Sequence, residues 1–301
     1  MGTQAGHVPV MLDEVIEHLA PRPGQAVLDG TAGGGGHAAA LLERIRPGGR
    51  LVVLDRDRGA LERLMARFGR SGDVRYFHAN FCDFDQALSE IEQEQIDGAI
   101  LDLGFSGDQL ADSGRGFSFD RPGPLDMRYD QGERLTAAEV VNRWPADRLA
   151  SIFREYGDQP FSRRIAKAIV EARRRRPIRR TDELAETVAR AVPAAWRRKQ
   201  NIHPATRVFQ SIRIVVNAEY DSLTTFLNKI WKYMKPGGRV AIIAFHSGED
   251  RIVKARFREA ERRGLAALPV KRPVRPAARE VKANPRARSA RLRVAVRLAA
   301  G

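Results

Sequence analysis

Glycines and acidic side chains that follow short apolar segments are the residues of this chain best suited to chemistry. The segment 26–28 (Ala-Val-Leu) ends in Asp29 and leads into five glycines within residues 30–36. Helix-like sequence then begins at His37. Glycine lets a ligand approach backbone N–H groups without a Cβ in the way, and N–H groups at a helix N-terminus lack partners. This loop therefore predicts a nucleotide-type cofactor site, the alternative being a tight turn with no ligand.

Two further acids follow apolar segments in the same manner. Asp55 ends the segment 51–55 and lies about 20 residues after the loop, where an acid can accept the hydroxyls of a ribose. Asp102 ends the segment 97–102. Because the carboxyl ends of parallel strands meet at one edge of a sheet, we expect Asp29, Asp55 and Asp102 to lie at the same ligand-binding edge.

The glycine loop alone does not identify the cofactor. Gly33, Gly35 and Ala38 fit the G-x-G-x-x-A pattern of dinucleotide sites. A ribose-binding acid is common to sites for NAD and sites for S-adenosylmethionine (SAM). These residues therefore leave open an NAD-dependent oxidoreductase as well as a SAM-dependent enzyme.

Length and composition indicate an ordinary globular protein. The chain has 301 residues with 43% hydrophobic residues, which is enough for a full core. The single cysteine, Cys82, cannot form an internal disulfide and fits a reducing compartment. The N-terminal sequence lacks a basic-then-apolar signal pattern, and no apolar run approaches the length of a membrane span. We therefore expect a cytoplasmic protein without membrane association.

Positive charge is concentrated in two parts of the chain. The net charge is +15, and residues 161–200 hold 13 Lys/Arg against 4 Asp/Glu, while residues 251–301 hold 16 against 3. The rest of the chain is mildly acidic. This distribution favours a polyanionic partner over a uniformly arginine-solvated surface, and arginine suits forked contacts to phosphate oxygens.

Apolar periodicity predicts an α/β fold with an insertion. We expect strands at 26–29, 51–54, 74–77 and 97–102, forming a parallel, doubly wound sheet. A long loop over 104–134 precedes helices at 136–142, 146–156, 161–176, 181–191 and 204–220, with Thr181 as an N-cap. The α/β pattern resumes with a turn at 236–238, a strand at 239–245, a basic helix to about 263 and a strand at 291–298. We expect residues 1–110 and 216–301 to form the cofactor-binding domain and residues 111–215 the substrate-recognition subdomain.

Several short motifs in the same order resemble one family, the MraW methylases or ribosomal RNA small subunit methyltransferases H. They are His7-Val8-Pro9-Val10, the Asp29 to His37 loop, Leu54-Asp55-Arg56-Asp57, Asp102-Leu103-Gly104, Arg115-Gly116-Phe117-Ser118-Phe119, Gly123-Pro124-Leu125-Asp126-Met127-Arg128, His203-Pro204-Ala205-Thr206-Arg207, Phe245-His246-Ser247 with Glu249-Asp250-Arg251, and Asn284-Pro285-Arg286-Ala287-Arg288. The chain departs from the family pattern at Phe105-Ser106-Gly107-Asp108, usually Val-Ser-Ser-Pro, and at Gly248, usually Leu.

The resemblance implies a Rossmann-like SAM-dependent methyltransferase that methylates N4 of a cytosine in the decoding region of small-subunit rRNA. The implied cofactor contacts are Gly35, Gly36 and His37 at the methionine end, Asp55 on the ribose, Phe81 beside the adenine, Asp102 and Gln109. From the residues alone, His37 is equally compatible with a solvated helix N-terminus, and Phe81 with ordinary core packing.

Methylation of an exocyclic amine sets requirements that two residues could meet. The amine is a poor nucleophile, so an acceptor must orient its lone pair toward the methyl group and take the developing positive charge. We expect Asp102 to be that catalytic acceptor, the alternative being a turn-capping acid. His246 follows the strand at 239–245 and is a second catalytic candidate, or else a structural histidine. The scattered histidines predict no metal site.

Aromatic and basic side chains are candidates for binding the RNA. Phe105, Phe117 and Phe119 could stack on an unstacked base, or anchor the long loop to the core. The backbone-binding candidates are Arg163, Arg164, Arg173, Arg174, Arg175, Arg176, Arg179 and Arg180. The expected partner is small-subunit rRNA or the 30S particle. The sequence leaves open a homodimer, and also a non-catalytic ribosome-assembly factor with the same fold.

Overall fold

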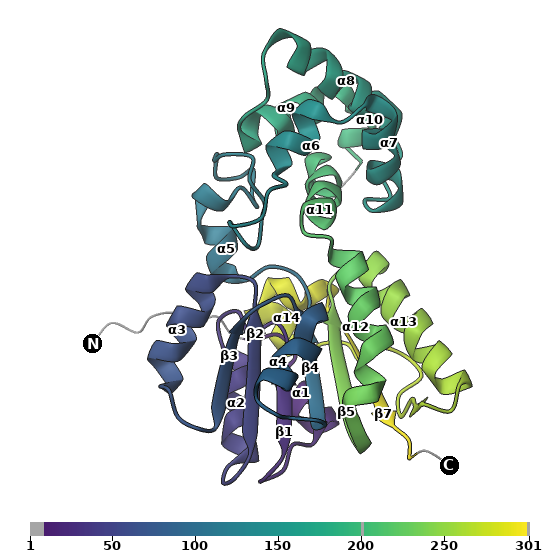
Figure 1. Ribbon diagram of the computed structural model, residues 1–301. Coiled ribbons are helices and arrows are strands. Elements are labelled where there is room, and N and C mark those ends of the chain that lie inside the picture. Colours follow the sequence, from purple (N-terminus) through teal and green to yellow (C-terminus); the bar gives the residue numbers. More distant parts are fainter. Residues whose placement is uncertain (1–8, 200–201, 300–301) are drawn as a thin grey trace. The chain divides into compact units, whose positions relative to one another are not determined.

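A computed structural model describes residues 9–199 and 202–299 of the chain, so His7 and Val8 of the first motif lie outside the described residues. The chain divides into two compact units (Figure 1). Residues 1–106 and 220–301 form the first, which we call the sheet unit, and residues 107–219 form the second, the helical unit. The assignment of cofactor binding to one part and substrate recognition to the other stays a prediction.

The sheet unit is built on a seven-stranded sheet with strand order β3-β2-β1-β4-β5-β7-β6. Its strands are β1 Ala26–Asp29, β2 Arg50–Asp55, β3 Val74–His78, β4 Ile96–Asp102, β5 Met234–Ala244, β6 Ala266–Ala267 and β7 Arg291–Arg297. The first five are mutually parallel, and β7 pairs antiparallel with both β5 and β6. This order confirms the predicted Rossmann-like sheet, including the strand expected at 291–298.

Helices cover both faces of the sheet, which explains why its central strands are apolar without alternation. Successive residues of a strand point to opposite faces. Thus Leu28 and Leu101 belong to a core with helices α4 Phe84–Glu90, α12 Glu219–Tyr233 and α13 Ser247–Arg262. Val27 and Ile100 belong to a second core with helices α1 Leu12–Leu19, α2 Gly36–Ile45 and α3 Arg58–Phe68. Short segments complete the unit: η1 Phe81–Asp83, α14 Ala278–Ala283 and η3 Pro285–Ser289.

The strand expected at 239–245 begins earlier than its sequence indicates. β5 starts at Met234, and Pro236 and the two glycines after it lie within its bounds. The register against β4 shifts between the pairs Ile96–Met234 and Gly98–Arg239. The predicted turn is therefore an irregularity inside the strand.

The helical unit surrounds its own hydrophobic core. Its elements are α5 Gly107–Ala111, η2 Ser113–Arg115, α6 Ala137–Arg143, α7 Ala146–Glu155, α8 Ser162–Arg175, α9 Thr181–Ala191, α10 Ala194–Arg197 and α11 Ala205–Val216. Ile165 and Ile169 of α8 are fully buried, four residues apart on one helix face. The predicted helices at 136–142, 146–156, 161–176 and 181–191 are confirmed with small shifts of their ends. Arg180, not Thr181, is the N-cap of α9, because the Thr181 hydroxyl accepts a hydrogen bond from Gly123 N (3.0 Å).

The prediction of one helix over 204–220 is wrong at the C-terminal end. α11 stops at Val216, Ala218 adopts a left-handed backbone (φ 48°), and α12 starts at Glu219. The Asn217 side chain accounts for the break. Its Oδ1 accepts from Tyr129 N and its Nδ2 donates to Met127 O, both at 2.7 Å. A tertiary contact to the loop thus replaces helix continuation.

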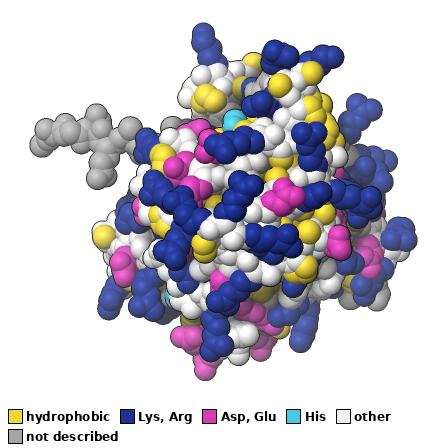
Figure 2. Space-filling view, turned by 90° about the horizontal axis from the view of Figure 1, so that it is seen from above, with side chains coloured by type: hydrophobic (Ala, Val, Ile, Leu, Met, Phe, Trp, Pro, Cys, Tyr) yellow, Lys and Arg dark blue, Asp and Glu magenta, His cyan; other side chains and the backbone are white. Residues whose placement is uncertain are grey.

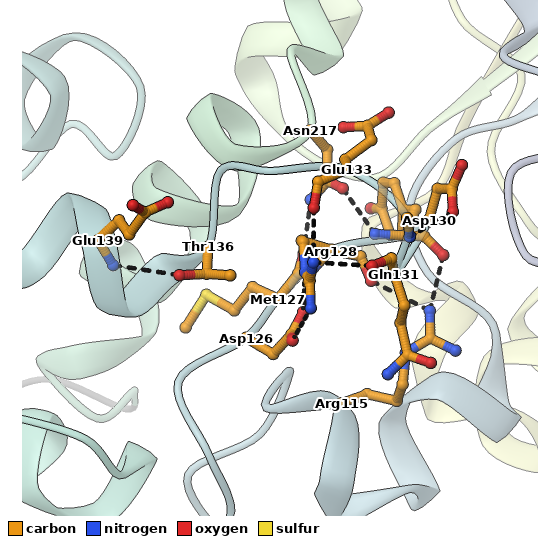
Figure 3. A network of polar contacts seen from close by, with 12 residues as sticks. Arg115, Asp126, Met127, Arg128, Asp130, Gln131, Glu133, Thr136, Glu139 and Asn217 are labelled. Atoms are coloured by element: carbon orange, nitrogen blue, oxygen red, sulfur yellow. Dashed lines mark hydrogen bonds and ion pairs between the residues drawn. The ribbon is translucent and has the colours of Figure 1, made fainter.

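The long loop predicted over 104–134 is held by a dense polar network in the helical unit (Figure 3). Arg115 is 9% exposed, and its Nη2 donates to Arg128 O (3.0 Å) and Tyr129 O (2.7 Å). The Arg128 guanidinium forms a forked pair with Asp126 at 2.9 and 2.7 Å. This network and Asn217 satisfy backbone groups that the irregular loop leaves without ladder partners.

Ion pairs that are partly buried connect β7 to α13. Asp250 accepts from Arg293 Nε (2.6 Å) and Arg291 Nη1 (3.0 Å), and its side chain is 12% exposed. Burial opposes ionisation of Asp250, but the two arginines outweigh it and lower the pKa of this carboxyl. Its ionised form therefore stabilises the docking of β7.

We predict that Asp250→Asn destabilises the fold by about 3 kcal/mol at neutral pH, because two guanidinium groups lose their counter-charge. The folded-state pKa is depressed, so the contribution is present above the unfolded pKa and is lost as pH falls through the folded value. Urea unfolding at pH 7 and pH 3 should show the difference shrinking at the lower pH. Glu259→Gln, which removes an exposed ion pair with Arg256 on the same helix, is the control and should change little. An equal loss at both pH values would contradict the assignment.

Candidate functional site

The glycine loop between β1 and α2 has a backbone that other residues could not adopt without strain. Gly33 and Gly35 have φ of 47° and 74°, and Gly35 is the N-cap of α2. A Cβ on Gly35 would lie 2.1 Å from Leu64 Cδ2, and one on Gly36 would lie 2.7 Å from Pro9 Cγ. The loop thus needs glycine both for its left-handed turns and for its close packing, and it starts α2 with no side-chain cap.

Asp55, at the end of β2, is fixed in orientation by the loop. Its Oδ2 accepts from Gly33 N and its Oδ1 from Asp57 N, both at 2.8 Å. Burial raises the pKa of Asp55, while the two backbone N–H groups act in the opposite direction. The next acid, Asp57, caps α3 by accepting from Gly59 N (3.0 Å). Asp55 therefore stands beside the glycine loop with carboxylate lone pairs in a set direction.

His37, in the first turn of α2, lies between the N-terminal segment and Asp102. The imidazole is 6% exposed, with Nε2 3.0 Å from Val10 O. Its Nδ1 lies 3.7 Å from Asp102 Oδ2. Since Val10 O can only accept, Nε2 carries a proton, and Nδ1 faces the carboxyl of Asp102. The sequence-predicted residues His37 and Asp102 are thus brought together.

Asp29 and Asp102 carry carboxyls at the ends of adjacent parallel strands, the first buried (1% exposed) and the second half-buried (side chain 19% exposed). Burial raises the pKa of Asp102 well above its ordinary value, and the charges of Asp29 and Glu249 add to the effect. Burial raises the pKa of Asp29 to about 7, against one hydrogen bond from Thr31 N (3.1 Å). Asp29 Oδ2 and Asp102 Oδ1 are buried without a hydrogen-bond partner in the described part of the chain. Two acceptor oxygens at this edge therefore remain available for a donor.

His246 and Glu249 stand where β5 passes into α13, on the same edge. His246 is the N-cap: its Nδ1 accepts from Glu249 N (3.4 Å), and Glu249 Oε2 accepts from Phe245 N (2.8 Å). His246 Nε2 lies 3.0 Å from Glu249 Oε1. The charge of Glu249 raises the pKa of Asp102, so the two carboxyls belong to one electrostatic group at this edge. The structure thus places His246 at the predicted edge, where it also has a structural capping role.

The remaining predicted cofactor residues lie in different surroundings. Phe81 is half-buried, packs edge-on against Phe226 (5.9 Å between ring centroids) and lies close to Gly30. Phe105 is half-buried in the segment after β4. Gln109 is 6% exposed in α5 of the helical unit, so its part in cofactor binding stays a prediction.

Of the aromatic residues expected to stack on a base, Phe117 is buried in the core of the helical unit and Phe119 is half-buried against it, so their stacking on a base stays a prediction. Phe117 is 8% exposed and stacks on Tyr129 at 5.5 Å between ring centroids. Phe119 packs against His203 (4.8 Å) and Phe209 (5.1 Å). Both rings pack in or against the core of the helical unit. Burying them stabilises the irregular loop to which they belong. They anchor the loop, which was the alternative left open by the sequence.

The predicted arginines of α8 and its C-terminal end separate into two groups. Arg173 donates from Nη1 to Val141 O (2.7 Å), and Arg176 pairs with Glu183, so both are engaged within the unit. Arg163, Arg164, Arg174 and Arg175 are exposed, and the described residues include no hydrogen-bond or ion-pair partner for them. Arg179 and Arg180 are also exposed, but Arg180 pairs with Asp182 (3.1 Å).

Three residues of this edge were not singled out as site residues by the sequence. Asp29 was placed at the edge without a role, although its position before the glycine loop was a usable signal. Glu249 was quoted only as part of a motif, although its place three residues after His246 at a helix start was a usable capping signal. Tyr220 carried no signal of its own, because only the fold brings it beside His246. The positions of the acids on parallel strand ends, by contrast, match the expectation.

Comparison with known proteins gives a consistent result. A family model described as the MraW methylase family matches residues 4–298. Three proteins named ribosomal RNA small subunit methyltransferase H are similar to the chain. The one from Nitratidesulfovibrio vulgaris is 46% identical (98% of this chain, 86% of the relative), and the one from Syntrophotalea carbinolica is 47% identical (97% and 98%). The one from Thermomicrobium roseum is 44% identical (97% and 94%).

We predict that Asp29→Asn stabilises the fold, and that the gain grows with pH. The unfolded carboxyl ionises near 3.8 and the folded one near 7, so the folded state binds more protons between these values and loses stability as pH rises. The asparagine keeps the acceptor for Thr31 N and removes this penalty, which reaches about 4 kcal/mol above pH 7. Urea unfolding at pH 4 and pH 8 measures it. Asp13→Asn, with a side chain 86% exposed, is the control. A gain that is the same at both pH values would show that Asp29 is not buried as a neutral acid.

Proposed function

Because the chain belongs to the MraW methylase family, we propose that it is a SAM-dependent methyltransferase acting on N4 of a cytosine in small-subunit rRNA. The observation that carries the proposal is the edge where Gly35, Asp55 and Asp102 meet in one unit, with an unpartnered acceptor oxygen on Asp102. SAM would supply a methyl group on a sulfonium, which is a ready electrophile.

The residues of this edge fit such a cofactor. Asp55 holds its carboxylate beside the glycine loop, where it can accept the two hydroxyls of a ribose. The first turn of α2, which starts at Gly36 without a side-chain cap, offers backbone N–H groups to a carboxylate such as that of the methionine end, while the Gly35 N–H already donates to Ala32 O (2.7 Å). Asp29 Oδ2, buried without a partner among the described residues, suits a cationic or N–H donor on the ligand. Phe81 is placed to pack against an adenine ring.

Asp102 is suited to receive the amine. Its free Oδ1 can accept an N–H of the cytosine amino group and so direct the nitrogen lone pair toward the methyl group. When the N–C bond forms and the C–S bond breaks, the nitrogen gains positive charge and must lose a proton. A carboxylate whose pKa is raised by burial is a better proton acceptor than a solvated one. His246 and Glu249 bound the same edge and would contact the base.

Exposed arginines of α8 would hold the RNA backbone. Arg163, Arg164 and Lys167 at its start and Arg174 and Arg175 at its end recur at helical spacing on its exposed side. Figure 2 shows Lys and Arg side chains spread over the whole face drawn, with fewer acidic ones between them. Such a surface binds phosphates without reading sequence. We assign substrate recognition to the helical unit and cofactor binding to the sheet unit.

None of the helices in the described ranges is both long and apolar enough to cross a membrane. The cytoplasmic location, the choice between free rRNA and the 30S particle, and a homodimer stay predictions. Two other functions are weighed by the experiment below: a non-catalytic assembly factor, and an NAD-dependent oxidoreductase, which the glycine loop alone would also allow.

We predict that the wild-type protein transfers label from methyl-labelled SAM to 16S rRNA or 30S particles, and that mass spectrometry locates it on a cytosine N4. Asp102→Asn should lower the rate at least about 100-fold, because it removes the proton acceptor while keeping the side chain's size. The wild-type rate should fall with decreasing pH, since the ionised form of Asp102 is required and its pKa is raised.

Cofactor titration and label transfer together separate the alternative functions. Calorimetric titration should give heat with SAM and none with NAD, and the reverse would favour an oxidoreductase. RNA binding without any label transfer would identify a non-catalytic factor. Asp73→Asn, an exposed acid paired with Arg46 in the sheet unit, is the control and should methylate normally. Near-normal turnover of Asp102→Asn would exclude the role of Asp102.

We further predict that replacing Arg163, Arg164, Arg174 and Arg175 with serine weakens RNA binding and flattens its salt dependence. Each lost phosphate contact should lower the slope of log K against log salt by about 0.7 to 0.9, since fewer counterions are released. Filter binding at several salt concentrations measures the slope. Arg143→Ser with Arg190→Ser is the matched control, because these exposed arginines of the same unit already pair with Glu139 and Glu186. Equal slopes for all three proteins would mean that α8 faces solvent in the complex.

A further inference from the structure

Gly248, in the first turn of α13, is a position where a side chain cannot be accommodated as the structure stands. A Cβ there would lie 1.8 Å from the hydroxyl oxygen of Tyr220 and 2.7 Å from its Cζ. It would also lie 3.3 Å from His246 Nδ1. The Tyr220 hydroxyl therefore occupies the volume that the Cβ of any other residue at 248 would need.

Tyr220 brings an aromatic ring against the histidine of the acceptor edge. It is the second residue of α12, and its ring lies 5.9 Å from the His246 ring at a tilt of 42°. On its other side His246 meets Glu249, whose Oε1 is 3.0 Å from Nε2, although Nε2 makes no well-aligned hydrogen bond among the described residues. The capping contact at Nδ1 is long, at 3.4 Å. Ring packing by Tyr220 is thus a substantial part of what holds the imidazole in its orientation.

We propose that Tyr220 and Gly248 are a coupled positioning pair: the glycine admits the tyrosine, and the tyrosine holds His246 toward Glu249 and the Asp102 edge for the RNA base. That the pair acts on an RNA base rests on the proposed function. That Tyr220 and Gly248 position His246 rests on the geometry of the sheet unit alone. Tyr220 acts through His246, and its hydroxyl also adds a polar group at the acceptor end. The pair should affect binding of the acceptor base and not of the cofactor. Its contacts are with His246, whereas Asp55 is held by the backbone N–H groups of Gly33 and Asp57.

The test is a double-mutant cycle on methyl transfer. Gly248→Ala is compatible with a helix but displaces the tyrosine hydroxyl, so kcat/KM for RNA should fall about tenfold. In a Tyr220→Leu background there is no hydroxyl to displace, and adding Gly248→Ala should change kcat/KM less than twofold. The Kd of SAM should stay within about twofold throughout. Additive losses, or a Gly248→Ala protein with unchanged kcat/KM, would overturn the pairing.

A second readout does not depend on catalysis. The NMR signals of the His246 ring, assigned with a His246→Gln protein, should shift on Gly248→Ala in the wild-type background and not in the Tyr220→Leu background. Tyr220→Phe, which keeps the ring, should shift them less than Tyr220→Leu. If the wild type transfers no methyl group, the proposed function fails, and the NMR cycle still decides the pair. Unshifted His246 signals in the Gly248→Ala protein would reject the positioning role whatever the activity.

Discussion

The convergence of acidic side chains at the carboxyl edge of a parallel sheet is the constraint on which this protein depends. Parallel pairing places Asp29, Asp55 and Asp102 at neighbouring strand ends, where Asp29 is buried and the other two are half-buried. Burying like charges is unfavourable, and the fold offsets it only in part through backbone N–H groups. Asp55 receives two of these, Asp29 receives one, and Asp102 is left with an unpartnered oxygen. Asp29 also keeps an unpartnered Oδ2, so the edge holds two acceptor oxygens without a hydrogen-bond partner among the described residues.

This imbalance links stability to chemistry. A carboxyl whose pKa is raised in the folded state lowers the stability of the fold at neutral pH, where it must ionise. The same carboxyl is a better proton acceptor for a reacting amine than a solvated one. His37 and Glu249 are neighbours of this carboxyl: the imidazole faces Asp102 at 3.7 Å, and the charge of Glu249 raises the pKa of Asp102. Gly30, Gly35 and Gly36 leave no room for a Cβ, so no side chain at these positions could satisfy the acids from within the protein. The arrangement is what a site selected for binding, not for stability, should look like.

Sequence reasoning reached the sheet and its acidic edge because both follow from local patterns. Uninterrupted apolar segments ending in Asp specify buried parallel strands, and strand direction alone then gathers the acids. It failed where a distant contact decides. Asn217 ends α11 by bonding to the 127–129 backbone, and nothing near residue 217 indicates that partner. Phe117 looks like a loop aromatic until the helical core is assembled around it. Within the Arg173–Arg176 run, only tertiary structure separates the arginines that are engaged from those that face solvent.

The position of β7 has a consequence for how the protein is made. This strand follows the other described elements in the sequence, yet it pairs with β5 on one side and β6 on the other. A nascent chain that has already produced the glycine loop and all the acids still lacks the strand that joins β6 to the sheet and places two arginines on Asp250. The sheet therefore closes only after residues 291–297 have been made. A chain that stops before β7 should have an unpaired edge on β5, which would expose it to proteases and to aggregation.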